Sequence, residues 1–137
     1  MVVRFDQVID DQAARLLAYA TGAPRGQRIE RYPEGRSRLA AAYVGARMVG
    51  VMGFDRDGDR VVLRHIAVDG DVRHRGTGRS MVTALRAHYP SLAVVAETDS
   101  ESVGFYRALG FDVRSLGEKY PGVERFAVTE RGRFRRL

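Results

Sequence analysis

The sequence HIAVDGDVRHRGTGRSMV, residues 65–82, decides the fold class and carries the clearest functional signal. Its apolar first part is typical of a strand that ends near Val68, and a helix is expected to begin near Gly76. A helix N-terminus has backbone N–H groups without helical partners and is the positive end of the helix dipole. The same turn holds five further side chains suited to anions: Arg73, Arg75, Thr77, Arg79 and Ser80. The stretch therefore predicts an anion site that suits a diphosphate.

Two common phosphate motifs do not fit this turn. A P-loop has a lysine at the position of Arg79 and a glycine at the position of Arg73. A dinucleotide-binding fingerprint has a third glycine at the position of Met81, and it follows the first strand of a strand–helix–strand unit. Neither motif therefore accounts for the turn.

The residues before this stretch predict a sheet built from neighbouring strands. The strand-like segments are residues 2–5, 38–44, 48–54 and 60–68. The last three are joined by short connections, of which residues 55–59 form an acidic turn, and this favours an antiparallel meander. Asp10 or Asp11 is expected to cap a helix, and residues 22–37 are expected to form a long loop or a broken helix.

The residues after Gly76 predict two helices that alternate with strands. The expected elements are a helix over 76–88, a strand over 92–96, a helix over 100–109, and strands over 111–114 and 124–129. Met81, Val82 and Leu85 share one side of the first helix, which Pro90 stops. The order of elements predicts an α/β or α+β fold with one mixed sheet and helices on its faces.

Two stretches of the chain together resemble the GNAT superfamily of acyl-CoA-dependent N-acyltransferases. The first family signature, (Gln/Arg)-x-x-Gly-x-(Gly/Ala), is matched by Arg73, Gly76 and Gly78. The second, an Asn followed by a helix with (Leu/Phe)-Tyr-x-x-x-Gly-Phe, is matched by Phe105, Tyr106, Gly110 and Phe111. Asp99 stands at the Asn position, where it still caps a helix but cannot donate an amide hydrogen bond. The resemblance covers roughly residues 38–129.

The resemblance implies a mixed, mostly antiparallel sheet that splays between its fourth and fifth strands, with helices on both faces. It implies acetyl-CoA as co-substrate, with the pantetheine arm paired to the fourth strand and the diphosphate on the glycine turn. Backbone N–H groups near Val68 would then hold the oxyanion. The residues implied to bind the coenzyme are Ile66, Ala67, Val68, Arg73, His74, Arg75, Gly76, Thr77, Gly78, Arg79, Ser80, Asp99 and Tyr106.

The same resemblance suggests the catalytic groups. Tyr106 is expected to protonate the leaving thiolate. If strand alternation is regular, Val62 and Arg64 take the fourth-strand positions where many family members have a glutamate base. Glu97, at the end of the fifth strand, is therefore the predicted general base. His65, the loop acids Glu30 and Glu34, and a water chain are the alternatives.

Composition sets the broad class of the protein. The 137 residues are expected to form one domain, 1–137, with a basic tail at 130–137. There is no cysteine, so disulfides, thiolate metal sites and cysteine nucleophiles are excluded, and no metal is expected. The longest apolar run is too short to span a membrane, and a cytoplasmic protein is expected. His88 is expected at the surface.

The net charge of +6 leaves more than one function open. Lys119 is the only lysine among 23 basic residues, which indicates codon bias more than a nucleic-acid partner. The leading hypothesis is an N-acetyltransferase that acts on a primary amine by direct attack, as a monomer or homodimer. A non-catalytic acyl-CoA-binding sensor is the main alternative, and nucleic-acid binding is a weaker one.

Overall fold

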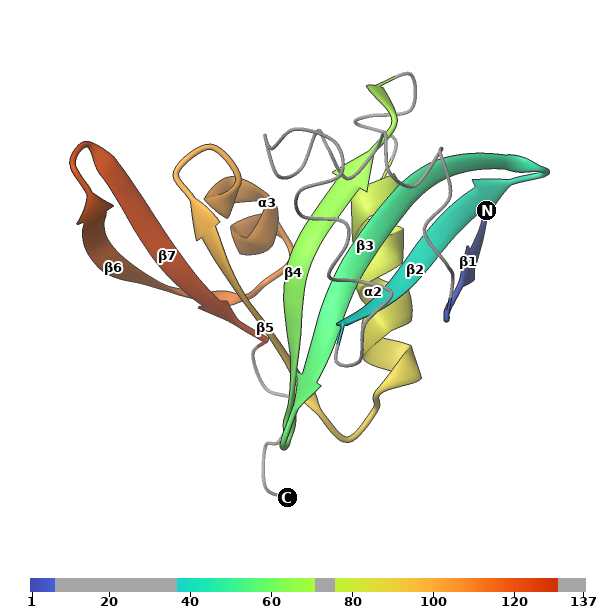
Figure 1. Ribbon diagram of the computed structural model, residues 1–137, viewed down its shortest axis with the longest axis horizontal. Coiled ribbons are helices and arrows are strands. Elements are labelled where there is room, and N and C mark those ends of the chain that lie inside the picture. Colours follow the sequence, from blue (N-terminus) through green and yellow to red (C-terminus); the bar gives the residue numbers. More distant parts are fainter. Residues whose placement is uncertain (7–36, 71–75, 131–137) are drawn as a thin grey trace.

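The computed structural model describes residues 1–6, 37–70 and 76–130, and all structural statements concern these residues. They form the strands and helices drawn in Figure 1. The elements are β1 (Val2–Arg4), β2 (Ser37–Val44), β3 (Arg47–Asp57), β4 (Arg60–Val68), α2 (Thr77–His88), β5 (Ala93–Asp99), α3 (Val103–Ala108), β6 (Asp112–Tyr120) and β7 (Val123–Thr129).

The strands form a single seven-stranded sheet in the order β1-β2-β3-β4-β5-β7-β6. The β2-β3-β4 meander is antiparallel, as the short connections predict. β4 and β5 are parallel. The crossover between them contains α2, which returns the chain to the edge of the sheet where β4 begins. This confirms the predicted mixed, mostly antiparallel sheet. Figure 1 shows β4 and β5 diverging toward their C-terminal ends, so that β5, β7 and β6 form a separate wing of the sheet.

Both described helices pack on one face of the sheet. On α2 the buried apolar residues are Met81, Val82 and Leu85, as their helical spacing predicts. They join Val103 and Tyr106 of α3 in the main core. Full burial of each such large side chain stabilises the fold by roughly 1.5–3 kcal/mol. A second buried cluster lies on the other face of the sheet, at Leu39, Ala41, Met48, Val51 and Ala67.

Several boundaries differ from the prediction. The predicted acidic turn over 55–59 is wrong, because β3 continues to Asp57 and the turn lies at Gly58 and Asp59. The second helix is shorter than predicted, and the last two strands form a longer hairpin that turns at Pro121 and Gly122. The predicted helix after Asp10 or Asp11, the 22–36 part of the predicted loop and residues 131–137 lie outside the described residues.

A β-bulge at Arg64 changes the alternation of side chains along β4. On β3, Gly53 pairs with His65 and the next residue, Phe54, pairs with Leu63. Arg64 is therefore the extra residue of the bulge. Leu63 before the bulge and Ile66 after it both reach the core under the helices. The predicted regular alternation, which places Arg64 on the same face as Ile66, is wrong for this reason.

Contacts of His88 with Phe5 and of Glu130 with Val94 and Arg86 tie residues near both termini to the rest of the fold. His88 is exposed as predicted, but its ring stacks on Phe5 with 3.8 Å between the ring centroids. Glu130, which the sequence assigns to the tail, is buried. Its carboxylate accepts hydrogen bonds from the Val94 N–H at 3.0 Å and from Arg86 Nε at 2.6 Å. Glu130 therefore belongs to the folded domain and joins the end of β7 to β5 and α2.

Candidate active site

The pairing of β4 with β5 ends where the bulge begins. The last paired residues are Leu63 and Ala96, although β4 continues to Val68 and β5 to Asp99. Beyond this point the only described strand that pairs with β5 is β7. A bulge bends its strand and increases the local twist. The bulge at Arg64 is thus a physical reason for the divergence, and the predicted coenzyme residues Ile66, Ala67 and Val68 lie on the diverging part of β4.

The N-terminus of α2 has the features of an anion site. Gly76 is the N-cap residue, with a φ of 79° that side chains rarely adopt. No side chain among the described residues caps this helix end. A Cβ atom added to Gly76 would meet no atom of the described residues within 4 Å, so the backbone is open to a ligand here. Arg73, His74 and Arg75 lie outside the described residues.

The side chains of the first turn of α2 divide between the interior and the surface. Thr77 is buried, whereas Arg79 and Ser80 are exposed. Arg79 donates a hydrogen bond from Nη2 to the carbonyl oxygen of Ala108 at 3.1 Å. Ala108 is the last residue of α3. The predicted diphosphate residue Arg79 therefore also connects the beginning of α2 to the end of α3.

Gly78 makes a second connection between these helices. A Cβ atom at this position would lie 3.0 Å from Cε1 of Phe105 and 3.2 Å from its Cζ. The missing side chain therefore makes room for an aromatic ring of α3. The sequence predicts close approach by a ligand at Gly78, and the structure shows close approach by Phe105.

Tyr106 follows Phe105 on α3 and lies in the core. Its ring makes edge contacts with Phe105 and Phe111, at centroid distances of 5.1 and 5.6 Å. Only 5% of the residue is exposed. Burial raises the pKa of the Tyr106 phenol to about 12. The phenol is therefore protonated at neutral pH and available as a hydrogen-bond donor.

Asp99 forms the turn that leads into α3. Its Oδ1 accepts a hydrogen bond from the Ser102 N–H at 2.9 Å. This is the local hydrogen bond expected of an Asp or Asn before a helix. One carboxylate oxygen of Asp99 is thus used in holding the start of α3.

Glu97 lies on β5 immediately after its last residue paired with β4. Its Oε1 accepts a hydrogen bond from Lys119 Nζ at 2.9 Å, and its Oε2 accepts one from Arg125 Nε at 3.0 Å. The hydrogen bond from Lys119, with a further one from Arg125, holds the pKa of the Glu97 carboxyl below its usual value. A carboxylate held by two cations is a weak proton acceptor, so these contacts weaken the predicted role of Glu97 as general base.

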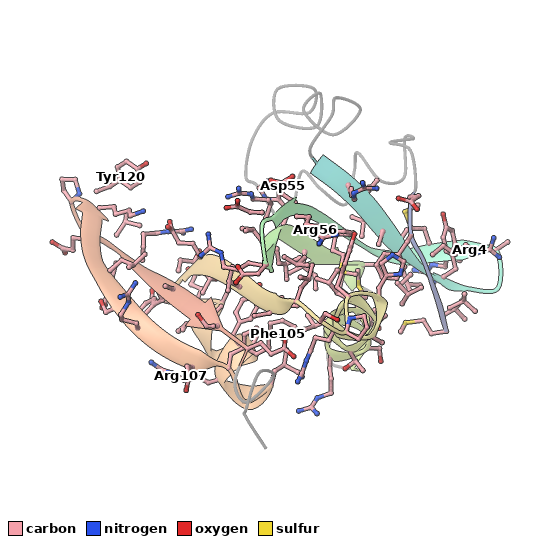
Figure 2. All side chains as sticks on the ribbon, turned by 90° about the horizontal axis from the view of Figure 1, so that it is seen from below. Arg4, Asp55, Arg56, Phe105, Arg107 and Tyr120 are labelled. Carbon is pink, nitrogen blue, oxygen red and sulfur yellow. The ribbon has the colours of Figure 1, made fainter. Side chains whose placement is uncertain are left out.

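A second ion pair lies on the other side of the divergence. Arg64 donates a hydrogen bond from Nε to Oδ2 of Asp55 at 2.8 Å. The Asp55 side chain is only 9% exposed, against 42% for Arg64. Figure 2 shows Asp55 on the side of the sheet away from Phe105 and Arg107.

Sequence reasoning missed Asp55, Lys119 and Arg125 as site residues. The sequence predicts Asp55 in a turn, and the longer β3 brings it beside Arg64. Lys119 reaches Glu97 because β6 is longer than predicted, and Arg125 reaches it because β7 pairs directly with β5. The β6–β7 register shifts twice, between Ser115 and Gly117 and between Glu118 and Tyr120, so spacing alone gives no signal for the contact of Lys119.

The alternative bases predicted from the sequence are His65, Glu30 and Glu34. His65 is half-buried on β4, directly after the bulge residue. Glu30 and Glu34 lie outside the described residues. Tyr120 is 66% exposed at the end of β6, on the same side of the sheet as Asp55 in Figure 2. Within the described ranges no group of three acidic or histidine side chains is suited to a metal ion, and no helix is long and apolar enough to cross a membrane.

The sequence of this chain matches one protein-family model over most of its length. The family model described as an acetyltransferase (GNAT) domain matches residues 6–123. The chain belongs to the GNAT acetyltransferase family. No curated protein gives a significant match. The family match confirms the resemblance read from the two sequence signatures.

Solved structures of GNAT proteins share the fold. An aminoglycoside 6'-N-acetyltransferase complexed with coenzyme A has a TM-score of 0.79 and 17% identity, covering 95% of this chain and 96% of that chain. A GNAT acetyltransferase from Elizabethkingia anophelis with acetyl-CoA bound has a TM-score of 0.73 and 17% identity, covering 93% and 95%. The ribosomal-protein-S18-alanine N-acetyltransferase from Escherichia coli has a TM-score of 0.71 and 16% identity, covering 93% and 92%.

Proposed function

We propose that this GNAT protein transfers an acetyl group from acetyl-CoA to a primary amine by direct attack of the amine. The observation that carries the proposal is the coincidence of three features in one region. The β4–β5 pairing ends at the bulge, α2 begins nearby with an uncapped N-terminus, and Tyr106 follows the residue that packs on this N-terminus. Two structures with the same fold hold coenzyme A or acetyl-CoA, which supports the proposal.

The residues present fit this co-substrate. The open backbone at Gly76 and the dipole of α2 suit a diphosphate. The exposed side chains of Arg79 and Ser80 add a charge and a hydroxyl beside it. The diverging part of β4, at Ile66 and Ala67, offers backbone to an extended chain. Acetyl-CoA supplies an activated acetyl group as a thioester.

Tyr106 is the proposed hydrogen-bond donor to the departing thiolate. Because its pKa is about 12, it stays protonated at neutral pH. A free thiol has a pKa of about 8.5, so full proton transfer from this phenol to a thiolate is uphill. The proposed role is therefore a hydrogen bond that stabilises the charge developing on sulfur, with water completing the protonation.

The transfer balances with groups of this chain and solvent. A carbon–nitrogen bond forms, the carbon–sulfur bond breaks, the amine loses one proton and the thiolate gains one. Glu97, the base predicted from the sequence, is a weak acceptor of the amine proton because Lys119 and Arg125 both bind its carboxylate. Water is therefore the proposed acceptor of this proton, and backbone N–H groups of β4 after the bulge are proposed to hold the oxyanion.

The experiment that tests this function measures thiol release from acetyl-CoA in the presence of simple primary amines. Product mass must show one added acetyl group. Tyr106→Phe is expected to lower kcat by about tenfold to a hundredfold with little change in coenzyme affinity, because it removes one donor to the transition state. Arg107→Gln, an exposed change one residue away, is the matched control and should keep wild-type rates. Coenzyme binding without any turnover would favour the sensor function instead.

A further inference from the structure

Arg64 of β4 and Arg125 of β7 lie on the same face of the sheet, near the place where β4 and β5 separate. Leu63 and Ala96, the last paired residues, both point into the core under the helices. Glu97 follows Ala96 and points to the opposite face by strand alternation. Arg64 reaches this face as well, because its partner Asp55 alternates with the core residue Phe54 on β3.

Arg125 lies on this face from the other side of the divergence. It follows β7 residue Glu124 and precedes Phe126, which points into the core. Its side chain turns to Glu97, with 3.0 Å between Nε and Oε2. Lys119 approaches the second oxygen of the same carboxylate. Among the described residues, the cations Arg64, Arg125 and Lys119 therefore outnumber the two carboxylates that they contact.

The two arginines are held in the same way. Each donates from Nε to a carboxylate, Arg64 to Asp55 and Arg125 to Glu97. Within the described part of the chain, neither uses its Nη groups in a hydrogen bond. A guanidinium anchored at Nε keeps a fixed orientation and presents its two Nη groups for planar anions such as carboxylate or phosphate.

We propose that the acceptor amine carries an anionic group, a carboxylate or a phosphate, which Arg64 and Arg125 bind. This inference rests on the proposed function, since it concerns the acceptor of the same reaction. The anchored guanidinium groups recognise the anion and hold the amine near the divergence of β4 and β5. A polycationic amine would instead meet two guanidinium groups and the Lys119 ammonium on this face, and like charges oppose its binding.

The test compares matched amines with the full-length chain and acetyl-CoA. L-Phenylalanine is compared with L-phenylalaninamide and phenethylamine, and O-phosphoethanolamine is compared with ethanolamine. The anionic member of at least one set is expected to have a kcat/KM at least about tenfold higher, as a charge-assisted pair provides. The set with the larger preference shows whether carboxylate or phosphate is the natural anion.

Variants show whether these arginines cause the preference. Arg64→Gln and Arg125→Gln are each expected to lower kcat/KM for the favoured anionic amine by about tenfold or more, and for its neutral partner by less than about threefold. Arg56→Gln is the matched control, because this exposed arginine neighbours Asp55 on β3 and alternates to the other face. Arg64→Lys, which keeps the charge, should retain part of the preference.

Two outcomes overturn the proposal. Neutral amines that react as well as their anionic partners overturn it, and so does the absence of turnover with every amine of the panel. Titration of the same preparation with acetyl-CoA separates this failure from failure of the proposed function. Neutral amines that react as well as their anionic partners reject the anionic acceptor alone, because their turnover shows the transfer itself. Intact coenzyme binding without turnover of any amine favours the sensor function and rejects both proposals, and loss of coenzyme binding rejects the coenzyme site as well.

Discussion

Gly78, in the first turn of α2, lies directly against the ring of Phe105 on α3. A Cβ atom at Gly78 would lie 3.0 Å from Cε1 of that ring, closer than ordinary van der Waals contact. The proposed diphosphate site and the helix that carries Tyr106 are therefore in direct contact. A change at either residue is expected to move the other.

Gly78→Ala should lower kcat more than it weakens acetyl-CoA binding. The added methyl group displaces Phe105 and with it Tyr106, at a stability cost of about 1–3 kcal/mol for an overpacked contact. Steady-state kinetics and thermal unfolding measure the two effects. Gly104→Ala is the control, because a Cβ atom there meets nothing within 4 Å and the position is helical.

Phe105→Leu gives the decisive second variant. Its smaller side chain makes room for the methyl group, so the double variant Gly78→Ala/Phe105→Leu should recover part of the kcat lost by Gly78→Ala. Additive losses in the double variant would show that Gly78 acts only through the ligand and not through Phe105.

The pKa of Tyr106 predicts the behaviour of the protein in alkali. The folded-state value of about 12 lies above the unfolded value of about 10, so the stability gained from the neutral phenol is complete below pH 10. As the pH rises from about 10 to 12, the unfolded state ionises first and about 3 kcal/mol of stability is lost. Denaturant unfolding of wild type and Tyr106→Phe measures this. An equal alkaline loss in both proteins would contradict the assignment.

The sequence was sufficient for the elements that rest on local patterns. The β4 bounds and the start of α2 follow from alternation and from the glycine turn, and the buried side of α2 follows from Met81, Val82 and Leu85. The bulge at Arg64 was not predictable, because it depends on how β3 pairs across from it. The ion pairs of Glu97 depend in the same way on strand pairing, since they join β5 to the β6–β7 hairpin, with partners 22 and 28 residues further along the chain.

Glu97→Gln separates a general base from an ion-pair anchor. Since its pKa is lowered, Glu97 has no ionisation near neutral pH, and the rate for a simple amine should rise with pH as the free amine becomes more abundant. We expect Glu97→Gln to keep this rise and to lower kcat by less than about tenfold, because the carboxylate mainly holds Lys119 and Arg125. A loss of about a hundredfold or more, with a changed pH profile, would establish Glu97 as the base.

Glu130→Ala should strongly destabilise the fold. The Glu130 side chain is 1% exposed and joins Arg86 to the Val94 backbone, so its removal leaves a buried N–H and a partly buried guanidinium without this acceptor. We expect a loss of about 2–4 kcal/mol in the free energy of unfolding, measured by denaturant titration. Glu130→Gln keeps an acceptor for Val94 and should lose less. Exposed Glu101→Ala should change stability by less than about 0.5 kcal/mol.

The most direct test of the central claim is calorimetric titration of the purified protein with acetyl-CoA, with ATP and NAD as controls. We predict saturable binding of one acetyl-CoA with a Kd on the order of micromolar, and much weaker binding of both controls. A bulky residue at Gly76, as in Gly76→Val, should weaken this binding by about tenfold or more, because the open backbone at the start of α2 would be filled. A folded wild-type protein that binds none of the three, or binds ATP and NAD as tightly as acetyl-CoA, would contradict the proposed coenzyme site.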